Sequence, residues 1–182
     1  MGWKDWHDRL HLLGLVAVLA ALGWLLMSGA PGDSGARTGS GVERAMEREM
    51  AYQARVAFLE QIYGPVEEMR RQGSHQQALL RLEQLNRQYA GEAHGFILRG
   101  LILHELGVLD EAAANFVRGL RINGDYVDER SPLSQRAPIQ ALVDEGHERL
   151  SARARANPDN PSVVAALRNV YYLQSRLAGG CE

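Results

Sequence analysis

The spacing of apolar residues changes along the chain and predicts two kinds of structure. From Leu10 to Met27 the sequence is almost continuously apolar, with eight leucines and two valines. About 18 apolar residues is the lower end of what spans a bilayer as a helix. From Val42 onward, apolar residues recur at helical spacing instead, with little of the strict alternation typical of strands. We therefore expect an all-α protein with an N-terminal transmembrane helix followed by a helical domain.

Residues 10–30 are predicted to form an uncleaved signal-anchor helix. No formally charged residue interrupts this segment, and tryptophans lie where interfacial aromatic residues are expected. A cleaved signal peptide is the alternative, because Ser28 and Ala30 resemble the small residues of a cleavage site. The length of the apolar run and Pro31, which would follow the cut, favour the anchor.

The residues that flank this segment predict its orientation. Lys4 and Arg9 precede it, whereas the nearest basic residue after it is Arg37. This bias favours a short cytoplasmic N-terminus at 1–9 and a single-pass membrane protein whose C-terminal domain is periplasmic or extracellular. Residues 31–41 are rich in glycine and serine and are expected to form a flexible linker.

The first helix after the linker is predicted over 42–63, where apolar residues lie four apart along one face. A proline inside a helix costs about 3 kcal/mol but is tolerated at a helix start. We therefore expect Gly64-Pro65 to end this helix and to begin the next one. Residues 42–63 then cap the domain formed by 64–182.

Two stretches of the domain repeat at an offset of 34 residues. The matching pairs are Gly73 with Gly107, Ala78 with Ala112, and Leu82 with Phe116. This spacing resembles the tetratricopeptide repeat (TPR), a helix–turn–helix unit of the same length. The resemblance implies a short α-solenoid, and its frames are 59–92, 93–126, a degenerate 127–160 and a partial 161–182.

The clearest frame, 93–126, has small residues where two helices must approach. Gly100 and Ala112 would supply that gap, Phe116 and Leu103 would fill the space beside it, and Gly107 would reverse the chain. In 127–160 two prolines are expected to leave a loop followed by one helix. Asn160 as N-cap and Pro161 at the first position predict the start of the last helix, which runs to about residue 177.

Repeats of the TPR family bind peptides or protein segments in a concave groove lined by their first helices. If Ile97 and Leu101 lay in this groove they would be exposed apolar residues, which favours a docked partner. The alternative is that loop 127–138 covers them and makes them core residues. Tyr171 falls on a helix-packing position, and Tyr172 on the groove side. The resemblance places these residues in the partner-binding groove: Tyr63, Glu67, Arg70, Arg71, His94, Ile97, Leu101, His104, Glu105, Ala165, Asn169 and Tyr172.

Composition and motifs give no sign of catalysis. The formal charge of −2 is too small for a nucleic-acid footprint, and the single Cys181 excludes an intramolecular disulfide. Its thiol is expected to be free at the chain end or, alternatively, to pair with another molecule. His104-Glu105 begins like a zinc-protease helix, but Val108 stands where the second histidine belongs. We expect no catalytic residue, no metal site and no cofactor.

These features favour a membrane-anchored scaffold for protein–protein interaction, namely an assembly factor or an accessory subunit of a membrane complex, and not an enzyme. Its partners would be membrane-associated or periplasmic proteins, and the anchor would raise their effective concentration. One alternative is a non-catalytic subunit that supports the active site of a partner enzyme. Another is a self-associating structural protein, a homo-oligomer formed through residues 42–63.

Overall fold

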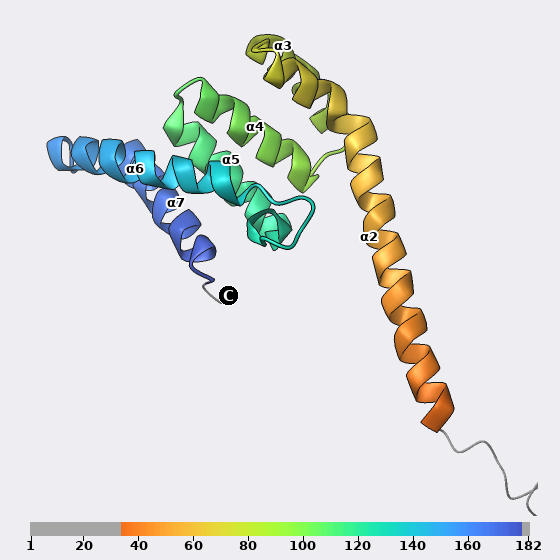
Figure 1. The fold of residues 1–182 in the computed structure, drawn as a ribbon. Helices are drawn as coiled ribbons and strands as arrows, with labels where there is room; N and C mark the ends of the chain where they lie inside the picture. The colour runs from red at the N-terminus through yellow and green to blue at the C-terminus, as the bar shows by residue number, and fades with distance from the viewer. Residues whose placement is uncertain (1–33, 180–182) are drawn as a thin grey trace, which may run out of the picture. The chain divides into compact units, whose positions relative to one another are not determined.

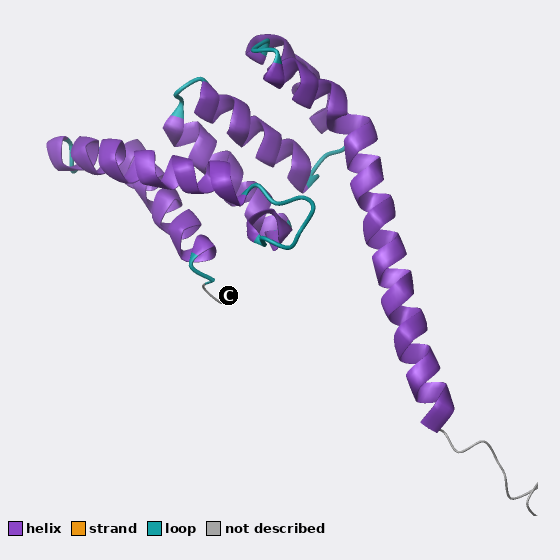
Figure 2. Cartoon of the chain, in the orientation of Figure 1, coloured by secondary structure: helices purple, strands orange, loops and turns teal. Residues whose placement is uncertain are grey.

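The computed structural model describes residues 34–179, with side chains described from Gly41 onward. These residues form helices joined by turns and loops, with no strand among them (Figures 1 and 2). The all-α expectation is therefore confirmed. The predicted N-terminus and anchor, 1–30, and Cys181 lie outside the described residues. The elements are α2 (Ser34–Arg71), α3 (His75–Gln88), α4 (Ala93–Glu105), α5 (Leu109–Ile122), the 3₁₀ helix η1 (Gly124–Val127), α6 (Arg136–Ala156) and α7 (Pro161–Leu177).

The chain divides into two units, Met1–Tyr52 and Gln53–Glu182. In the first unit the described residues form the beginning of α2, where Val42, Met46 and Met50 are exposed. The second unit holds the buried apolar core. Within 34–179, no helix combines the length and the apolar character that a membrane crossing requires.

The break expected at Gly64-Pro65 is absent, because α2 continues through both residues to Arg71. Two physical reasons explain the difference. Gly64 has no Cβ, which relieves the clash that normally keeps a residue before proline out of the helical region. Leu59 and Val66, on either side of the proline, are both buried, and each contributes about 1.5–3 kcal/mol by its burial. Together they offset the cost of about 3 kcal/mol for the proline. The linker predicted at 31–41 likewise overlaps the first turns of α2.

The same helix-ending turn occurs at Gly73 and Gly107. The Gly107 N–H donates to the His104 carbonyl and the Val108 N–H donates to the Leu103 carbonyl, both at 2.9 Å. This pair of bonds is a Schellman motif, which needs a left-handed residue, and φ is 75° at Gly73 and 76° at Gly107. Gly73 donates to Arg70 and Ser74 to Met69, again at 2.9 Å. The turn predicted at Gly107 is confirmed, and its equivalent lies 34 residues earlier.

Close packing of α4 on α5 depends on Gly100. A Cβ at this position would lie 2.8 Å from Cδ1 of Phe116, a distance that real side chains do not tolerate. Ala112 and Phe116 are fully buried and Leu103 is nearly so. The approach that the sequence predicts between these two helices is therefore confirmed.

The C-terminal part forms a second helical pair, α6 with α7, and α7 also packs on α5. Residues 128–135 form a loop before α6, and Pro138 is the third residue of that helix, where the missing N–H has no helical partner to lose. The predicted start of the last helix is confirmed. Asn160 is its N-cap, with the side-chain oxygen accepting from Ser162 N–H at 3.0 Å, and Pro161 is its first residue.

Candidate partner-binding surface

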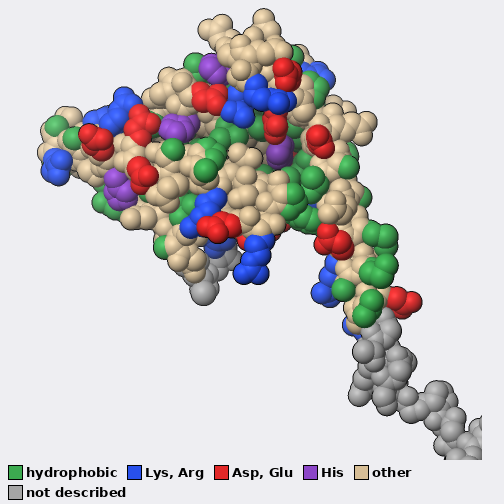
Figure 3. All heavy atoms as spheres, viewed as in Figure 1, with side chains coloured by type: hydrophobic (Ala, Val, Ile, Leu, Met, Phe, Trp, Pro, Cys, Tyr) green, Lys and Arg blue, Asp and Glu red, His purple; other side chains and the backbone are tan. Residues whose placement is uncertain are grey.

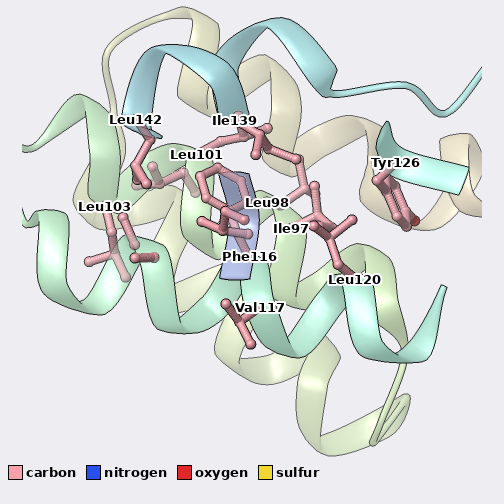
Figure 4. Close-up of a cluster of buried hydrophobic side chains, with 14 of the residues drawn as sticks. Ile97, Leu98, Leu101, Leu103, Phe116, Val117, Leu120, Tyr126, Ile139 and Leu142 are labelled. Carbon is pink, nitrogen blue, oxygen red and sulfur yellow. The ribbon is translucent and has the colours of Figure 1, made fainter. Parts of the chain in front are cut away.

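Four of the predicted groove residues are core residues, namely Tyr63, His94, Ile97 and Leu101. The expectation that Ile97 and Leu101 are exposed is therefore wrong. Figure 4 shows both among the buried apolar side chains, together with Ile139 and Leu142 from α6. They are core residues, as in the alternative, but the cluster around them includes Ile139 and Leu142 of α6, which lie beyond the loop 127–138 that was expected to cover them.

Polar groove residues behave differently, because they pair across helices. Arg70 on α2 donates from Nη1 to Oε1 of Glu105 on α4. His75 at the start of α3 places Nε2 3.0 Å from the other oxygen, Oε2, of the same carboxylate. Glu105 therefore joins three helices. The structure brings the predicted residues Arg70 and Glu105 together and adds His75, which the groove prediction did not include.

A second polar junction connects α4 to α6. His104 Nε2 lies 3.1 Å from Oε2 of Glu145, and Arg149 donates to Oε1 of the same carboxylate. These contacts lower the pKa of Glu145, chiefly through the hydrogen bond from Arg149 and further through that from His104, while burial opposes the shift. Sequence reasoning identified His104 but missed Glu145 and Arg149. Their i,i+4 spacing on one helix was the available signal.

His94 lies at the centre of a third, more buried cluster. Its Nδ1 is 3.0 Å from the Tyr126 hydroxyl, and its Nε2 is 3.5 Å from Oε1 of Glu67. The ring of Tyr63 lies beside it, with centroids 5.0 Å apart. Contact with His94 lowers the pKa of Glu67, burial raises it, and the charges of nearby arginines lower it further. The Glu67 carboxylate is therefore ionised at neutral pH.

Burial acts in the same direction on the two tyrosines of this cluster. It raises the pKa of Tyr63 to about 12 and also raises that of Tyr126, so both hydroxyls keep their protons. The Tyr126 oxygen has His94 as its partner. The Tyr63 hydroxyl is buried without a hydrogen-bond partner. Tyr126 was not a predicted site residue, because it is the last residue of frame 93–126 and lies outside the first helix, whose positions the prediction used.

We call the polar residues of these three junctions the histidine–carboxylate face. They come from α2, α3, α4 and α6, and Figure 3 shows histidine, acidic and basic side chains distributed over this side of residues 53–179. Each histidine in the set contacts a carboxylate on another helix. The members are Glu67, Arg70, His75, His94, His104, Glu105, Glu145 and Arg149.

A cleft of about 300 Å³ opens next to His94 and Glu67. One wall is α2, and the opposite wall is the loop before α6. The cleft is lined by Val56, Leu59, Glu60, Gly64, Glu67, His94, Pro132, Leu133 and Gln135. Neither a lysine nor an arginine is among these residues.

The remaining predicted groove residues do not join this face. Arg71 pairs with Glu68 of its own helix at 2.9 Å. Ala165 is exposed and Asn169 half-buried on α7, which packs on α5 and α6. The two tyrosines of α7 are reversed relative to expectation. Tyr171 is 50% exposed, against the expectation of a core position, whereas Tyr172 packs against the core beneath the Arg121 guanidinium.

Within the described residues, no group of three or more histidine, cysteine, aspartate or glutamate side chains has the geometry to hold a metal ion. Comparison of the chain with protein-family models, curated proteins and solved structures gives no match.

Proposed function

We propose that this protein is a TPR-like helical-repeat scaffold that binds a partner protein through the histidine–carboxylate face. The recurrence of one Schellman turn at Gly73 and Gly107 supports the repeat. Buried small residues between α4 and α5 support it further. The resemblance of the sequence to the TPR family supplies the function expected of such an array, which is recognition of other proteins.

The inter-helix polar junctions are the observation that carries the proposal. Exposed or half-exposed ion pairs contribute at most about 1 kcal/mol each to stability, so their groups are available to exchange partners at little cost. Side chains such as Glu105, Glu145 and Arg149 already have their charges fixed in position by neighbouring helices. Positioned charges of both signs give an interface its specificity and speed of association. Recognition at this face is therefore polar, in contrast to the apolar groove that the sequence predicts.

Residues 10–30 are proposed to hold the scaffold at a membrane, with the helical domain on the periplasmic or extracellular side. Tethering the domain confines it to the membrane surface and raises the effective concentration of partners there. In this proposal the chain is an assembly factor or accessory subunit of a membrane complex and is not itself an enzyme.

Capture of partners from native membranes tests this function. The face variant replaces His104 and Glu145 together by alanine, which removes both ends of the α4–α6 contact and leaves only the exposed Arg149 without its carboxylate. A matched control replaces Glu83 and Arg87, an exposed i,i+4 pair on α3, in the same way. The proposal requires that crosslinked partners be lost from the face variant and retained by the control, with both proteins equally helical by circular dichroism. Equal capture by all three proteins refutes it.

Self-association is a second candidate, favoured by the exposed apolar residues of α2. Val42, Met46 and Met50 lie four apart and are exposed by 59%, 59% and 62%. When two copies of the protein associate, these residues of one copy would shield those of the other from water. Sedimentation of the full-length protein in detergent tests this candidate. A strict monomer at tens of micromolar excludes it, whereas a dimer that Met46→Glu dissociates supports it.

A further inference from the structure

Carboxylates border the exposed apolar residues near the start of α2. We call these apolar residues the α2 stripe, namely Val42, Met46 and Met50. A helix turns by about 100° per residue, so Glu43 and Glu47 lie along one edge of the stripe and Glu49 along the other. Arg44 and Arg48 lie on the opposite face of the helix. Within the described residues, Glu43 and Glu47 have no ion pair.

These edges disfavour a contact between the α2 stripes of two copies. In a parallel pair of helices, the edge with Glu43 and Glu47 meets the edge with Glu49 of the other copy. In an antiparallel pair, each edge meets the same edge of the other copy. Both arrangements place carboxylates against carboxylates, and like charges that face each other across an interface are unfavourable. The α2 stripe is therefore complementary to a surface that is both apolar and positively charged.

The outer side of α5 and α7 combines these two properties. The two helices pack together, and neither α5 after its first turn nor any part of α7 contains an aspartate or a glutamate. Arg118, Arg121 and Arg168 are exposed, and none of the three has an ion pair within the part of the chain that the structure describes. The Arg121 guanidinium lies 5.2 Å from the centroid of the Tyr172 ring, so it reaches from α5 to α7.

Exposed apolar side chains accompany these arginines. Val164 is 39% exposed and Tyr171 is 50% exposed. They lie four residues before and three residues after Arg168, which places all three on one face of α7. We call this basic and apolar set the α5–α7 surface, namely Arg118, Arg121, Val164, Arg168 and Tyr171.

We propose that the α2 stripe of one copy binds the α5–α7 surface of a second copy. The contact brings Glu43 and Glu47 to arginines that lack acidic partners, and it withdraws apolar side chains of both surfaces from water. Methionine suits such a contact, because its thioether packs favourably against aromatic rings such as that of Tyr171. The inference rests on the self-association candidate, for which it names the second surface, and it does not involve the histidine–carboxylate face.

The two contacting surfaces are different, so the association is head-to-tail. Each bound copy keeps one α2 stripe or one α5–α7 surface free, and further copies can add until a ring closes or a row extends. The unmodified full-length protein in detergent is therefore expected to form species larger than a dimer as its concentration rises. Sedimentation measures this growth, and a dimer that never grows overturns the head-to-tail assignment.

Charge reversal on each surface tests the contact in the same assay. The stripe variant carries Glu43→Arg and Glu47→Arg, and the α5–α7 variant carries Arg118→Glu and Arg168→Glu. Each variant is expected to weaken self-association by about tenfold or more, because two attractions become repulsions. All four side chains are exposed, so both variants should keep the helical content of the unmodified protein by circular dichroism.

A mixture of the two variants gives the sharpest result. In the mixture, each reversed surface meets a reversed surface of opposite charge, and each unmodified surface meets an unmodified one. Association is therefore expected to recover, although neither variant associates alone. A contact between two α2 stripes predicts that the α5–α7 variant associates like the unmodified protein. That result, or a mixture that does not recover, overturns the proposal.

Controls and separate outcomes distinguish this inference from the candidate on which it rests. Glu148→Arg on α6 and Arg81→Glu on α3 change exposed charges outside both surfaces and should leave association unchanged. Equal weakening by these controls overturns the proposal, because net charge would then be the cause. If the unmodified protein is a strict monomer, self-association and this inference both fall. If Met46→Glu dissociates the protein and the α5–α7 variant does not, self-association stands and only this assignment falls.

Discussion

Substitution of the two turn glycines by alanine isolates the free energy of the repeated Schellman turn. Gly73 and Gly107 adopt φ of 75° and 76°, and a Cβ built at either position meets no atom within 4 Å. A new methyl group therefore meets no neighbour, and its whole cost is conformational. For L-residues the left-handed conformation costs about 1–2 kcal/mol, and the stiffer unfolded chain of the variant offsets up to about 1 kcal/mol of this.

We expect Gly73→Ala and Gly107→Ala each to lower the free energy of unfolding by about 1 kcal/mol. Asparagine tolerates the left-handed region and should cost less, whereas β-branched valine should cost more. Chemical denaturation of the full-length protein in detergent, followed by circular dichroism at 222 nm, measures the change, and thermal melting should shift by about 2–4 °C. Equal stability of the alanine, asparagine and valine variants contradicts the conformational origin of the cost, and a large effect at only one glycine contradicts the view that the two turns are equivalent.

Three other predictions follow from packing, capping and titration. Phe116→Ala removes a fully buried ring and should cost about 3–5 kcal/mol of stability in the same denaturation assay. Asn160→Ala removes the N-cap of α7 and should cost about 1 kcal/mol, with a smaller loss for Asn160→Ser. Because the folded pKa values of Glu67 and Glu145 are depressed, their contribution to stability is present above the unfolded pKa of about 4.3 and is lost as the pH falls through the folded values. Glu67→Gln and Glu145→Gln should therefore each be less stable than the unmodified protein at pH 7 but not at pH 2, and a difference that persists at pH 2 would exclude this cause.

Local backbone chemistry made much of the fold predictable. Gly107 and Asn160 act within a few residues of their own position, so a left-handed turn and an N-cap can be inferred from sequence alone. The gap at Gly100 was also predictable, because a repeat places a small residue where two helices meet. The effect of Pro65 was predicted wrongly because it does not depend on local sequence alone. Whether α2 continues past Pro65 depends on burial of Leu59 and Val66, which only tertiary packing decides.

The site was less predictable than the fold. Family positions indicate which residues of a first helix face the concave side, but they do not show that α6 covers that side. Ile139 and Leu142 belong to the degenerate frame, where the register of the repeat is lost, and so the burial of Ile97 and Leu101 was left as an alternative. The pairing of Arg70 with Glu105 and of His104 with Glu145 likewise joins residues 35 and 41 positions apart.

The burial of Ile97 and Leu101 has a consequence for how the proposed complex would respond to salt. With those side chains removed from water, a docking molecule meets charges on that side, and the field of an exposed charge extends only about 8 Å at physiological ionic strength. Added salt shortens that reach, so the complex proposed above would assemble quickly in dilute buffer and dissociate as the electrolyte concentration rises. Binding in an apolar groove would instead survive high salt, since burial of apolar surface persists in concentrated salt.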